Sequence, residues 1–237
     1  MYRAGQIVKA SLDEVEAAIR PGVSTWELNE IAERTTLKLK GKPAFKGYRG
    51  FPACLCTSIN DEVVHGIPRK NRILKEGDII GIDYGASFEG YFGDSARTIP
   101  VGFSPKGKVA DLLATTKKAL ELAISATAEG KFVRDVSEAI ENYVAPKGFG
   151  IVKDYVGHGI GTKPHEDPPI PHYVTRERGA RLQVGMCICI EPMINMGTDE
   201  VQLLEDGWTV STVDGSLSAH FEHTLAVTEE GVRVLTI

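Results

Sequence analysis

Long apolar runs, clustered basic residues and familiar catalytic loops are all missing from this sequence, and each absence excludes a class of protein. No stretch approaches the roughly 18 uninterrupted apolar residues of a membrane span, and the N-terminal segment lacks the apolar core of a signal peptide. Lysine and arginine are scattered singly along a chain of net charge −5, so no surface for a phosphate backbone is expected. We therefore expect a cytoplasmic protein that binds neither membranes nor nucleic acids.

Cysteine is scarce as well, and its spacing argues against a metal cluster. The four cysteines form two Cys-x-Cys pairs on apolar segments, Cys54 with Cys56 and Cys187 with Cys189. Zinc sites usually separate their cysteines by more residues, and cytoplasmic proteins keep their thiols reduced, so we expect four reduced, buried side chains. A Walker loop, a Gly-x-Ser-x-Gly elbow and a Gly-x-Gly-x-x-Gly fingerprint are also absent, so the chemistry depends on other residues.

An internal repeat is the most informative feature that is present. The segment LKEGDIIGID, residues 74–83, matches LQVGMCICIE, residues 182–191: each has a leucine, a glycine three residues later and an acid at its end. The same offset of 108 residues relates two helix-like segments, for example Gly22 to Gly130 and Glu30 to Glu138. Because several segments share one offset in one order, we predict a duplicated half within a single domain over residues 1–237.

Helical and strand patterns follow the same order in both halves. Helices are expected over residues 3–19, 25–40, 105–129 and 133–147. Strands are expected over residues 53–59, 78–85, 91–99, 151–156, 186–195, 207–213 and 220–227. Helices that precede hairpin-rich strands, rather than alternating with them, favour an α+β fold whose mainly antiparallel sheet is covered by helices on one face.

Two aspartates interrupt apolar strand sequence and raise the question of what neutralises them. If Asp83 and Asp94 lie on a hairpin that turns at residues 87–90, they face each other directly, with Cβ atoms about 5 Å apart. Such a pair needs a cation between its carboxylates or a shared proton. The repeat relates Asp83 to Glu191, and the strand SAHFEHTLAV adds Glu222. Because proton sharing does not neutralise four buried carboxylates, we predict two divalent cations.

A histidine between two glycines is the fifth candidate ligand. His158 lies in VGHGIG, where its neighbours have no Cβ to obstruct an ion or a substrate. Four carboxylates and one imidazole form an oxygen-rich set typical of Mn, Fe or Co, with ions about 3.5–4 Å apart. Two such ions activate a bridging water near neutral pH, and a nearby carboxylate can pass its proton to a leaving amine. The set therefore predicts hydrolysis.

The remaining candidates depend on their surroundings. His65 in DEVVHGIP and His165 in KPHEDP are compatible with structural roles, but their loop settings also suit donation of a proton to a developing oxyanion. His172 has no such context and is expected at the surface. Trp208 in EDGWTV is compatible with the core or with the wall of an apolar pocket.

Together these motifs resemble those of the bacterial type I methionine aminopeptidases, over essentially the whole chain. The segments that carry the resemblance are GIDYGASFEGYFGDSARTI, VGHGIGTKPHEDP, IEPMI and FEHTLAVT. The resemblance implies the pita-bread fold, an α+β fold of two pseudo-symmetric halves with a curved sheet, in agreement with the repeat. It also implies two divalent metal ions, drawn from Co, Mn, Fe and Zn.

The resemblance assigns a role to each ligand. Asp83 would hold one ion, Asp94 and Glu222 would bridge both, and His158 with Glu191 would complete the other. Glu191 would also shuttle a proton for the bridging hydroxide that attacks the peptide carbonyl. The implied enzyme is a monomer that removes the initiator methionine from nascent polypeptides whose second residue is small, at the ribosome.

Substrate contacts are implied as well. His65 and His165 match histidines that contact the scissile peptide in this family. A flexible thioether side chain suits an apolar pocket. The residues expected to line that pocket are Tyr48, Phe51, Cys56 and Trp208. Three positions depart from the family pattern: Phe45, Pro164 and His220. His220 shares a strand face with Glu222 and is expected near the metals.

Two alternatives remain open. Aminopeptidase P and prolidase share the fold and the metal set, so an Xaa-Pro peptidase is the first alternative. Those relatives usually carry an additional N-terminal domain, whereas here the catalytic pattern starts almost at residue 1. A non-catalytic binding module on the same fold is the second alternative. Such modules lack ligands that are all present here, which disfavours this reading.

Overall fold

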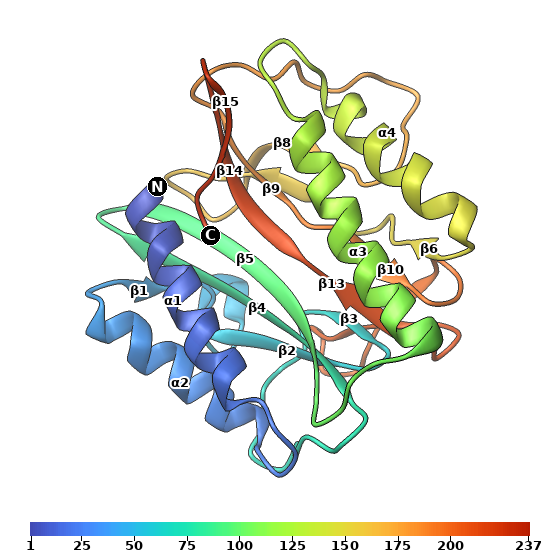
Figure 1. Cartoon of the computed structure of the whole chain (residues 1–237). Coiled ribbons are helices and arrows are strands. Elements are labelled where there is room, and N and C mark those ends of the chain that lie inside the picture. Colours follow the sequence, from blue (N-terminus) through green and yellow to red (C-terminus); the bar gives the residue numbers. More distant parts are fainter.

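Two pairs of helices cover one face of a curved sheet (Figure 1). The computed structural model describes residues 1–237. Its helices are α1 (Tyr2–Ala18), α2 (Thr25–Lys38), α3 (Gly107–Ala126) and α4 (Val133–Val144), with short 3-10 turns η1 (Tyr48–Gly50) and η2 (Ala145–Lys147). Each helix begins and ends within three residues of its expected bounds. None combines the length and the apolarity that crossing a membrane requires.

Local signals explain where the second helix begins. The hydroxyl of Ser24 accepts the N–H of Glu27 at 3.2 Å, and the carboxylate of Glu27 accepts the N–H of Ser24 at 2.8 Å. This reciprocal pair satisfies backbone donors that a helix start otherwise leaves unpaired. In the other half, the carboxylate of Asp135 accepts the N–H of Phe132 at 2.7 Å and supports the start of α4.

The main sheet has nine strands, and all its pairings are antiparallel. Its order is β1-β4-β5-β14-β9-β7-β8, with β2 also paired to β4 and β15 to β14. The strands are β1 (Lys42–Pro43), β2 (Leu55–Ile59), β4 (Ile79–Phe88), β5 (Tyr91–Pro100), β7 (Gly157–Gly159), β8 (Glu166–Ile170), β9 (Cys187–Ile190), β14 (Glu222–Thr228) and β15 (Gly231–Val234). The expected α+β architecture is confirmed.

Two small sheets complete the fold. One contains β6 (Gly150–Ile151), β10 (Met193–Asn195) and β13 (Ser218–His220). The other contains β3 (Glu62–Val64), β11 (Val201–Leu203) and β12 (Val210–Thr212). The second of these sheets joins β3 of the first half to β11 and β12 of the second half.

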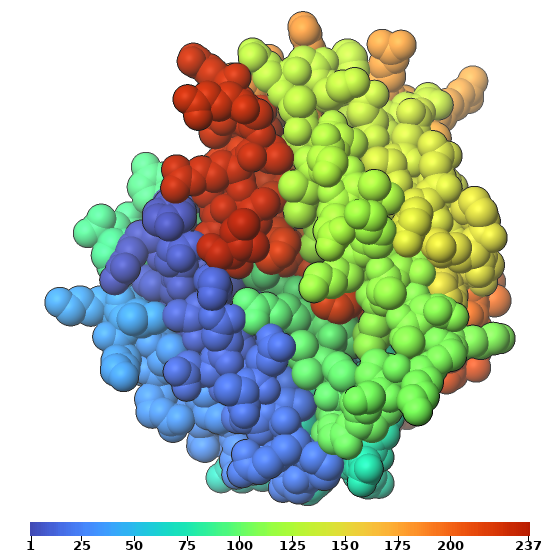
Figure 2. All heavy atoms as spheres, viewed as in Figure 1, coloured from blue at the N-terminus to red at the C-terminus, as the bar shows by residue number.

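The core lies between the helices and the main sheet, in two clusters. On β4, Ile80, Ile82 and Tyr84 belong to the cluster that also contains the buried side chains of α1 and α2. Because neighbouring residues of a strand point to opposite faces, Asp83 and Gly85 face away from the helices. Figure 2 shows the helix-covered face, where atoms of β5 and of the C-terminal segment remain visible between α1 and α3. The opposite face is therefore the one that carries the acids.

The internal repeat has a structural counterpart. Residues 25 and 79, where α2 and β4 begin, lie 108 positions before residues 133 and 187, where α4 and β9 begin. The strand β14 pairs with β5 from the first half and with β9 from the second, so one sheet runs through both. These observations support the duplicated single domain, which remains our proposal.

Two expected strands are interrupted. The segment 186–195 divides into β9 and β10, which belong to different sheets, because Pro192 between them has no N–H to donate to a ladder. Of the segment 151–156, only the first residue lies in a strand. The expected ranges did not include β1, β3, β7, β8, β11 and β15, because pieces this short carry little periodicity.

The hairpin of β4 and β5 turns one residue later than expected. Glu89 and Gly90 form the turn, with φ angles of 51° and 83°, as a type I′ turn requires. In this register Asp83 pairs with Ala96, two residues beyond Asp94, so the expected direct pairing of the two aspartates is wrong. A turn displaced by one whole residue moves each partner by two positions. Both aspartates therefore keep the same face of the sheet.

Candidate metal centre and active site

Four neighbouring strands bring a first row of side chains together on the face opposite the helices. Cys56 on β2 pairs with Asp83 on β4, Asp83 pairs with Ala96 on β5, and Ala96 pairs with Glu222 on β14. The pairing of β14 with β9 continues this row to Glu191, directly after the last residue of β9. Three carboxylates from distant parts of the sequence thus share one row.

A second row runs beside the first. The N–H of Asp94 on β5 donates to the hydroxyl oxygen of Thr224 on β14 at 2.8 Å, and that hydroxyl donates to the carbonyl of Asp94 at 2.7 Å. Thr224 pairs with Cys189 on β9, and Cys189 pairs with His158 on β7. This row adds the fourth carboxylate and the imidazole.

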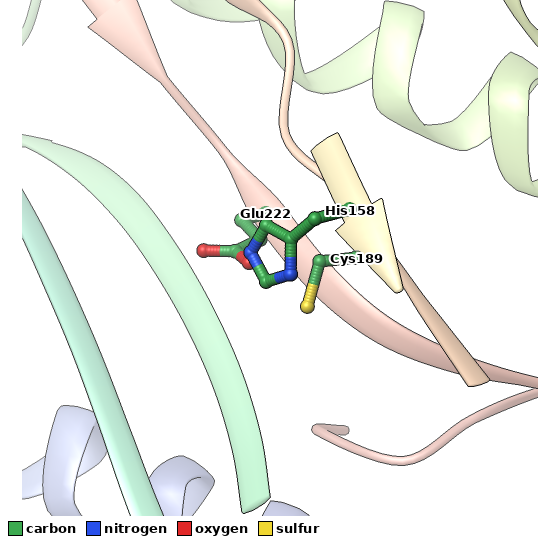
Figure 3. A group of neighbouring side chains, drawn as sticks. All are labelled: His158, Cys189 and Glu222. Carbon is green, nitrogen blue, oxygen red and sulfur yellow. The ribbon is translucent and has the colours of Figure 1, made fainter. Parts of the chain in front are cut away.

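The side chains of the two rows converge. Asp83, Asp94 and Glu222 each offer an oxygen within 4.8 Å of the others. His158, Cys189 and Glu222 each offer one ligand atom within the same distance (Figure 3). Glu222 belongs to both groups. The residues predicted to hold metal therefore lie in one site, and their roles as ligands remain a prediction.

Several carboxyl oxygens of the site have no hydrogen-bond partner. One oxygen each of Asp83, Asp94 and Glu222 is buried without a hydrogen-bond partner. Burial, followed by the neighbouring carboxylates, raises the pKa of Asp94 and of Glu222 well above the ordinary range. Burial also raises the pKa of Glu191. Buried acids at this spacing need protons or cations among them at neutral pH.

His158 presents a lone pair to these acids. Its Nδ1 lies 2.8 Å from the carbonyl oxygen of Gly159, which can only accept, so Nδ1 carries the proton. Its Nε2 is then unprotonated and lies 3.5 Å from Oε1 of Glu191. Burial lowers the pKa of His158, which keeps the ring neutral at neutral pH. A neutral imidazole beside buried carboxylate oxygens is a donor set that divalent transition-metal ions prefer, so these residues fit the predicted metals.

A cavity of about 140 Å³ opens onto the acids. It is smaller than the roughly 300–1,000 Å³ of sites for drug-sized ligands, and suits one amino-acid side chain. Phe51 and Trp208 form part of its wall, with ring centroids 5.1 Å apart. Its apolar lining consists of Phe45, Tyr48, Phe51, Cys56 and Trp208. The four residues expected to line a pocket are among these five, and their contact with methionine remains a prediction.

The two candidate substrate histidines line the same cavity. His165 stacks on Tyr48 with ring centroids 5.2 Å apart, and its Nδ1 lies 3.1 Å from the Tyr48 hydroxyl. Partial burial, followed by the nearby His158, lowers the pKa of His165 to about 3. Burial lowers the pKa of His65 to about 4. Both rings are therefore neutral at neutral pH, and each can donate one N–H.

Two further histidines lie beside Glu191. The expectation that His172 lies at the surface is wrong: it is fully buried, and its Nε2 accepts the N–H of Glu191 at 3.3 Å. His220, expected near the metals, is also buried, and its Nε2 lies 3.7 Å from Oε2 of Glu191. The contacts that bury His172 come from segments distant in sequence, so its local context carried no signal.

Sequence reasoning missed two residues of the site, Cys189 and Arg49. The alternation in CICIE places Cys189 on the same strand face as Glu191, a signal that was available. Arg49 lines the cavity from η1 with a φ of 48°, and its guanidinium carbon lies 5.4 Å from the centre of the Tyr48 ring. Nothing in its local sequence distinguishes Arg49 from an ordinary surface arginine.

Comparison with known proteins gives one consistent result. Residues 1–229 match the model of metallopeptidase family M24. Methionine aminopeptidase 1 of Bacillus subtilis is 49% identical over 237 residues, which cover 100% of this chain and 94% of that protein. The methionine aminopeptidase of Aquifex aeolicus is 47% identical over 243 residues, covering 99% of this chain and 93% of that protein. The crystal structure of methionine aminopeptidase from Thermotoga maritima matches with a TM-score of 0.96 at 45% identity, covering 100% of this chain and 94% of that one.

Proline-specific peptidases are more distant. The prolidase from Pyrococcus furiosus matches with a TM-score of 0.75 at 23% identity, and this chain covers 62% of its length. Similarity at that level shows the fold alone. Membership of a metallopeptidase family implies divalent metal ions, in agreement with the donor groups of the site. The full-length matches confirm the resemblance and the pita-bread fold, and this chain belongs to metallopeptidase family M24, among its methionine aminopeptidases.

Proposed function

We propose that this chain is a dinuclear metal-dependent exopeptidase that removes the initiator methionine from nascent polypeptides in the cytoplasm. One observation carries the proposal: four carboxylates, two of them buried, and an unprotonated imidazole nitrogen line a cavity sized for one side chain. The family supplies the reaction class, and the apolar lining of the cavity favours methionine at the first position. The preference for a small second residue rests on the resemblance to the family.

The proposed ligands divide between two ions. Asp83 would hold one, His158 and Glu191 would hold the other, and Asp94 with Glu222 would serve both. Three partnerless buried oxygens and the place of Glu222 in both donor groups support this division. Divalent ions bound there, drawn from Co, Mn, Fe and Zn, supply polarisation of the scissile carbonyl and activation of a water.

Glu191 is the residue that moves protons in this proposal. Its carboxylate takes a proton from the attacking water and returns it to the leaving amine. Nε2 of His158 and Nε2 of His220 lie 3.5 Å and 3.7 Å from its two oxygens and confine the carboxylate between them. The N–H of Glu191 is also tied to His172, so both the backbone and the side chain of the proton carrier are held.

His65 and His165 orient the substrate. Each ring is neutral and can donate one N–H, one toward the scissile peptide nitrogen and one toward the carbonyl oxygen as it gains charge. Tyr48 holds the ring of His165 by stacking and by a hydrogen bond to Nδ1. The first side chain fills the cavity beside the acids, which brings the free amine of the substrate to them and limits cleavage to the first residue.

The decisive experiment compares two tripeptides. Protein stripped with a chelator is assayed on Met-Ala-Ser and on Ala-Pro-Ala, before and after addition of Mn²⁺ or Co²⁺. We expect metal-dependent release of methionine only from the first. Cleavage of the proline peptide alone would replace the proposal with an Xaa-Pro peptidase. If neither peptide is cleaved in a metal-dependent reaction, the result would favour a non-catalytic binding module.

A pair of variants tests the ligand assignment. Asp94→Asn should abolish measurable turnover and lower the metal content of the purified protein, because it removes a carboxylate that serves both ions. Asp111→Asn, an exposed residue of α3, is the matched control and should leave both unchanged. Full activity in Asp94→Asn would remove Asp94 from the metal centre.

The working state of the enzyme is also part of the proposal. We infer that it acts as a monomer on chain ends that emerge from the ribosome, because a free methionine terminus first exists there. Sedimentation velocity should give a single species of the mass of one chain. Cosedimentation should place the protein with translating ribosomes, and its absence from that fraction would remove the ribosome from the proposal.

A further inference from the structure

Cys189 is a buried thiol in the middle of the site, and the proposed reaction does not use it. It is 0% exposed and lies between Thr224 and His158 in the second row. Its Sγ lies 3.5 Å from the hydroxyl oxygen of Thr224. Figure 3 shows it beside His158 and Glu222, and one donor atom from each of the three lies within 4.8 Å of the others.

A second observation points to a ligand at this position. Glu222 is 2% exposed, and its Oε1 is buried without a hydrogen-bond partner. A buried, unpaired carboxylate oxygen is costly unless a cation or a proton satisfies it. Cys56, the other cysteine that faces the site, lies beside Asp83 at the opposite end and belongs to no such three-donor group.

The two ends of the site differ in donor chemistry. Asp83, Asp94 and Glu222 offer only oxygen, which suits a hard ion such as Mn²⁺. The other end offers an imidazole nitrogen, a thiol sulfur and the shared carboxylate of Glu222, the mixture that zinc binds in tetrahedral sites. Oε1 of Glu191, 3.5 Å from Nε2 of His158, is within reach as a fourth donor.

We propose that His158, Cys189 and Glu222 form a thiolate-containing zinc centre, so that the His158 end of the site prefers Zn²⁺ while the all-carboxylate end accepts Mn²⁺. When zinc binds, the S–H proton of Cys189 leaves to solvent as the sulfur–zinc bond forms, and no electron is transferred. This inference rests on the metal centre of the proposed function. It adds a residue that sets metal preference within that centre.

Cadmium reports directly on the thiolate, because a cadmium–sulfur bond produces an ultraviolet charge-transfer absorption that oxygen ligands do not. Metal-free full-length protein is titrated with Cd²⁺ as wild type, Cys189→Ser and Cys56→Ser. We expect the wild type and Cys56→Ser to develop the absorption and to saturate at one equivalent. Cys189→Ser should show none. Circular dichroism checks that each variant is folded.

Two results would overturn the proposal. One is the absence of the absorption in the wild type, and the other is its survival in Cys189→Ser. If Cys189→Ser does not fold, the cadmium NMR shift of the wild-type complex still distinguishes sulfur from oxygen ligands without any substitution. A competition titration adds a quantitative arm: Cys189→Ser should lose about tenfold or more in Zn²⁺ affinity, with a much smaller change for Mn²⁺. An equal loss for both ions would contradict a role in metal preference.

The same preparation separates this inference from the proposed function. If wild-type protein cleaves Met-Ala-Ser with Mn²⁺ but shows no cadmium–sulfur absorption, the result supports the proposed function and contradicts the thiolate centre. The reverse result is an absorption that saturates at one equivalent without peptide cleavage under any metal. It would support the thiolate centre and contradict the peptidase function.

Discussion

Neutralising one acid of the site should make the metal-free protein more stable. Burial raises the pKa of Asp83 from its ordinary value of 3.8 to about 7. Each unit of difference between the folded and unfolded pKa corresponds to about 1.4 kcal/mol. The carboxyl of Asp83 therefore destabilises the metal-free fold by about 4 kcal/mol at neutral pH, where the unfolded chain carries it ionised without penalty. We expect the free energy of unfolding of metal-free Asp83→Asn to exceed that of the wild type by about this amount.

The sign of the pH dependence follows from the direction of the shift. Between about pH 4 and pH 7 the folded state binds the Asp83 proton more tightly than the unfolded state, so the free energy of unfolding falls as pH rises across this window. Histidines with lowered pKa, such as His65, act in the opposite direction, because they bind protons less readily when folded. Their contribution is common to both proteins, so the difference between wild type and Asp83→Asn reports on the Asp83 carboxyl and on the charge through which it raises the pKa of the neighbouring acids.

Urea unfolding of chelator-treated protein, followed by circular dichroism, measures this difference. The advantage of Asp83→Asn should be largest at neutral pH and vanish below about pH 3, where the wild-type carboxyl is protonated in both states. Asp111→Asn is the exposed control and should unfold like the wild type. Added Mn²⁺ should narrow this difference, since an ion at 100-fold its Kd stabilises the wild type by about 2.7 kcal/mol and binds the variant less. Metal-free Asp83→Asn no more stable than wild type at neutral pH would refute the reasoning.

Three further substitutions test other parts of the site. Gly157→Ala should destabilise the protein by about 1–3 kcal/mol in urea unfolding, because the added Cβ overlaps the carbonyl of Cys189. Gly81→Ala is the control, because its added Cβ would make only ordinary van der Waals contacts, and it should stay within about 0.5 kcal/mol. His165→Ala should lower kcat/KM for Met-Ala-Ser by about 100-fold through the loss of an oxyanion donor, and an unchanged value would exclude that role. Trp208→Ala should raise KM by about tenfold or more by opening the cavity wall, and a change confined to kcat would contradict its placement there.

Local patterns were sufficient for the helices and for the face of each acid, but not for the register. The amphipathic pattern and the cap at Ser24 define α2 without any tertiary information. The turn of the β4–β5 hairpin depends on which residues adopt positive φ, and Glu89 gives no sequence signal for that conformation. The prediction that Asp83 and Asp94 share one face of the sheet was still correct, because strand side chains alternate with a period of two residues.

The surroundings of His172 and Cys189 could not be predicted from local sequence, and the reason is the same for both residues. His172 is fully buried, and its Nε2 accepts the N–H of Glu191, a residue that no short window around position 172 contains. Cys189 acquires its surroundings from His158 on one side and from β14 on the other. Burial of a polar group depends on partners that only the assembled sheet provides. The buried face of an amphipathic helix, by contrast, can be predicted from the periodicity of its own sequence.

The position of β14 connects the metal centre to the stability of the whole sheet. Glu222 lies between β5 of the first half and β9 of the second, and it is the one residue present in both donor groups. An ion that binds this residue therefore draws ligands from both halves, and its binding free energy opposes their separation. Without the ion, the same residue leaves a buried oxygen without a hydrogen-bond partner at the seam between the halves. Metal removal should accordingly weaken the contact between the two halves before it weakens the helix-covered core of either one.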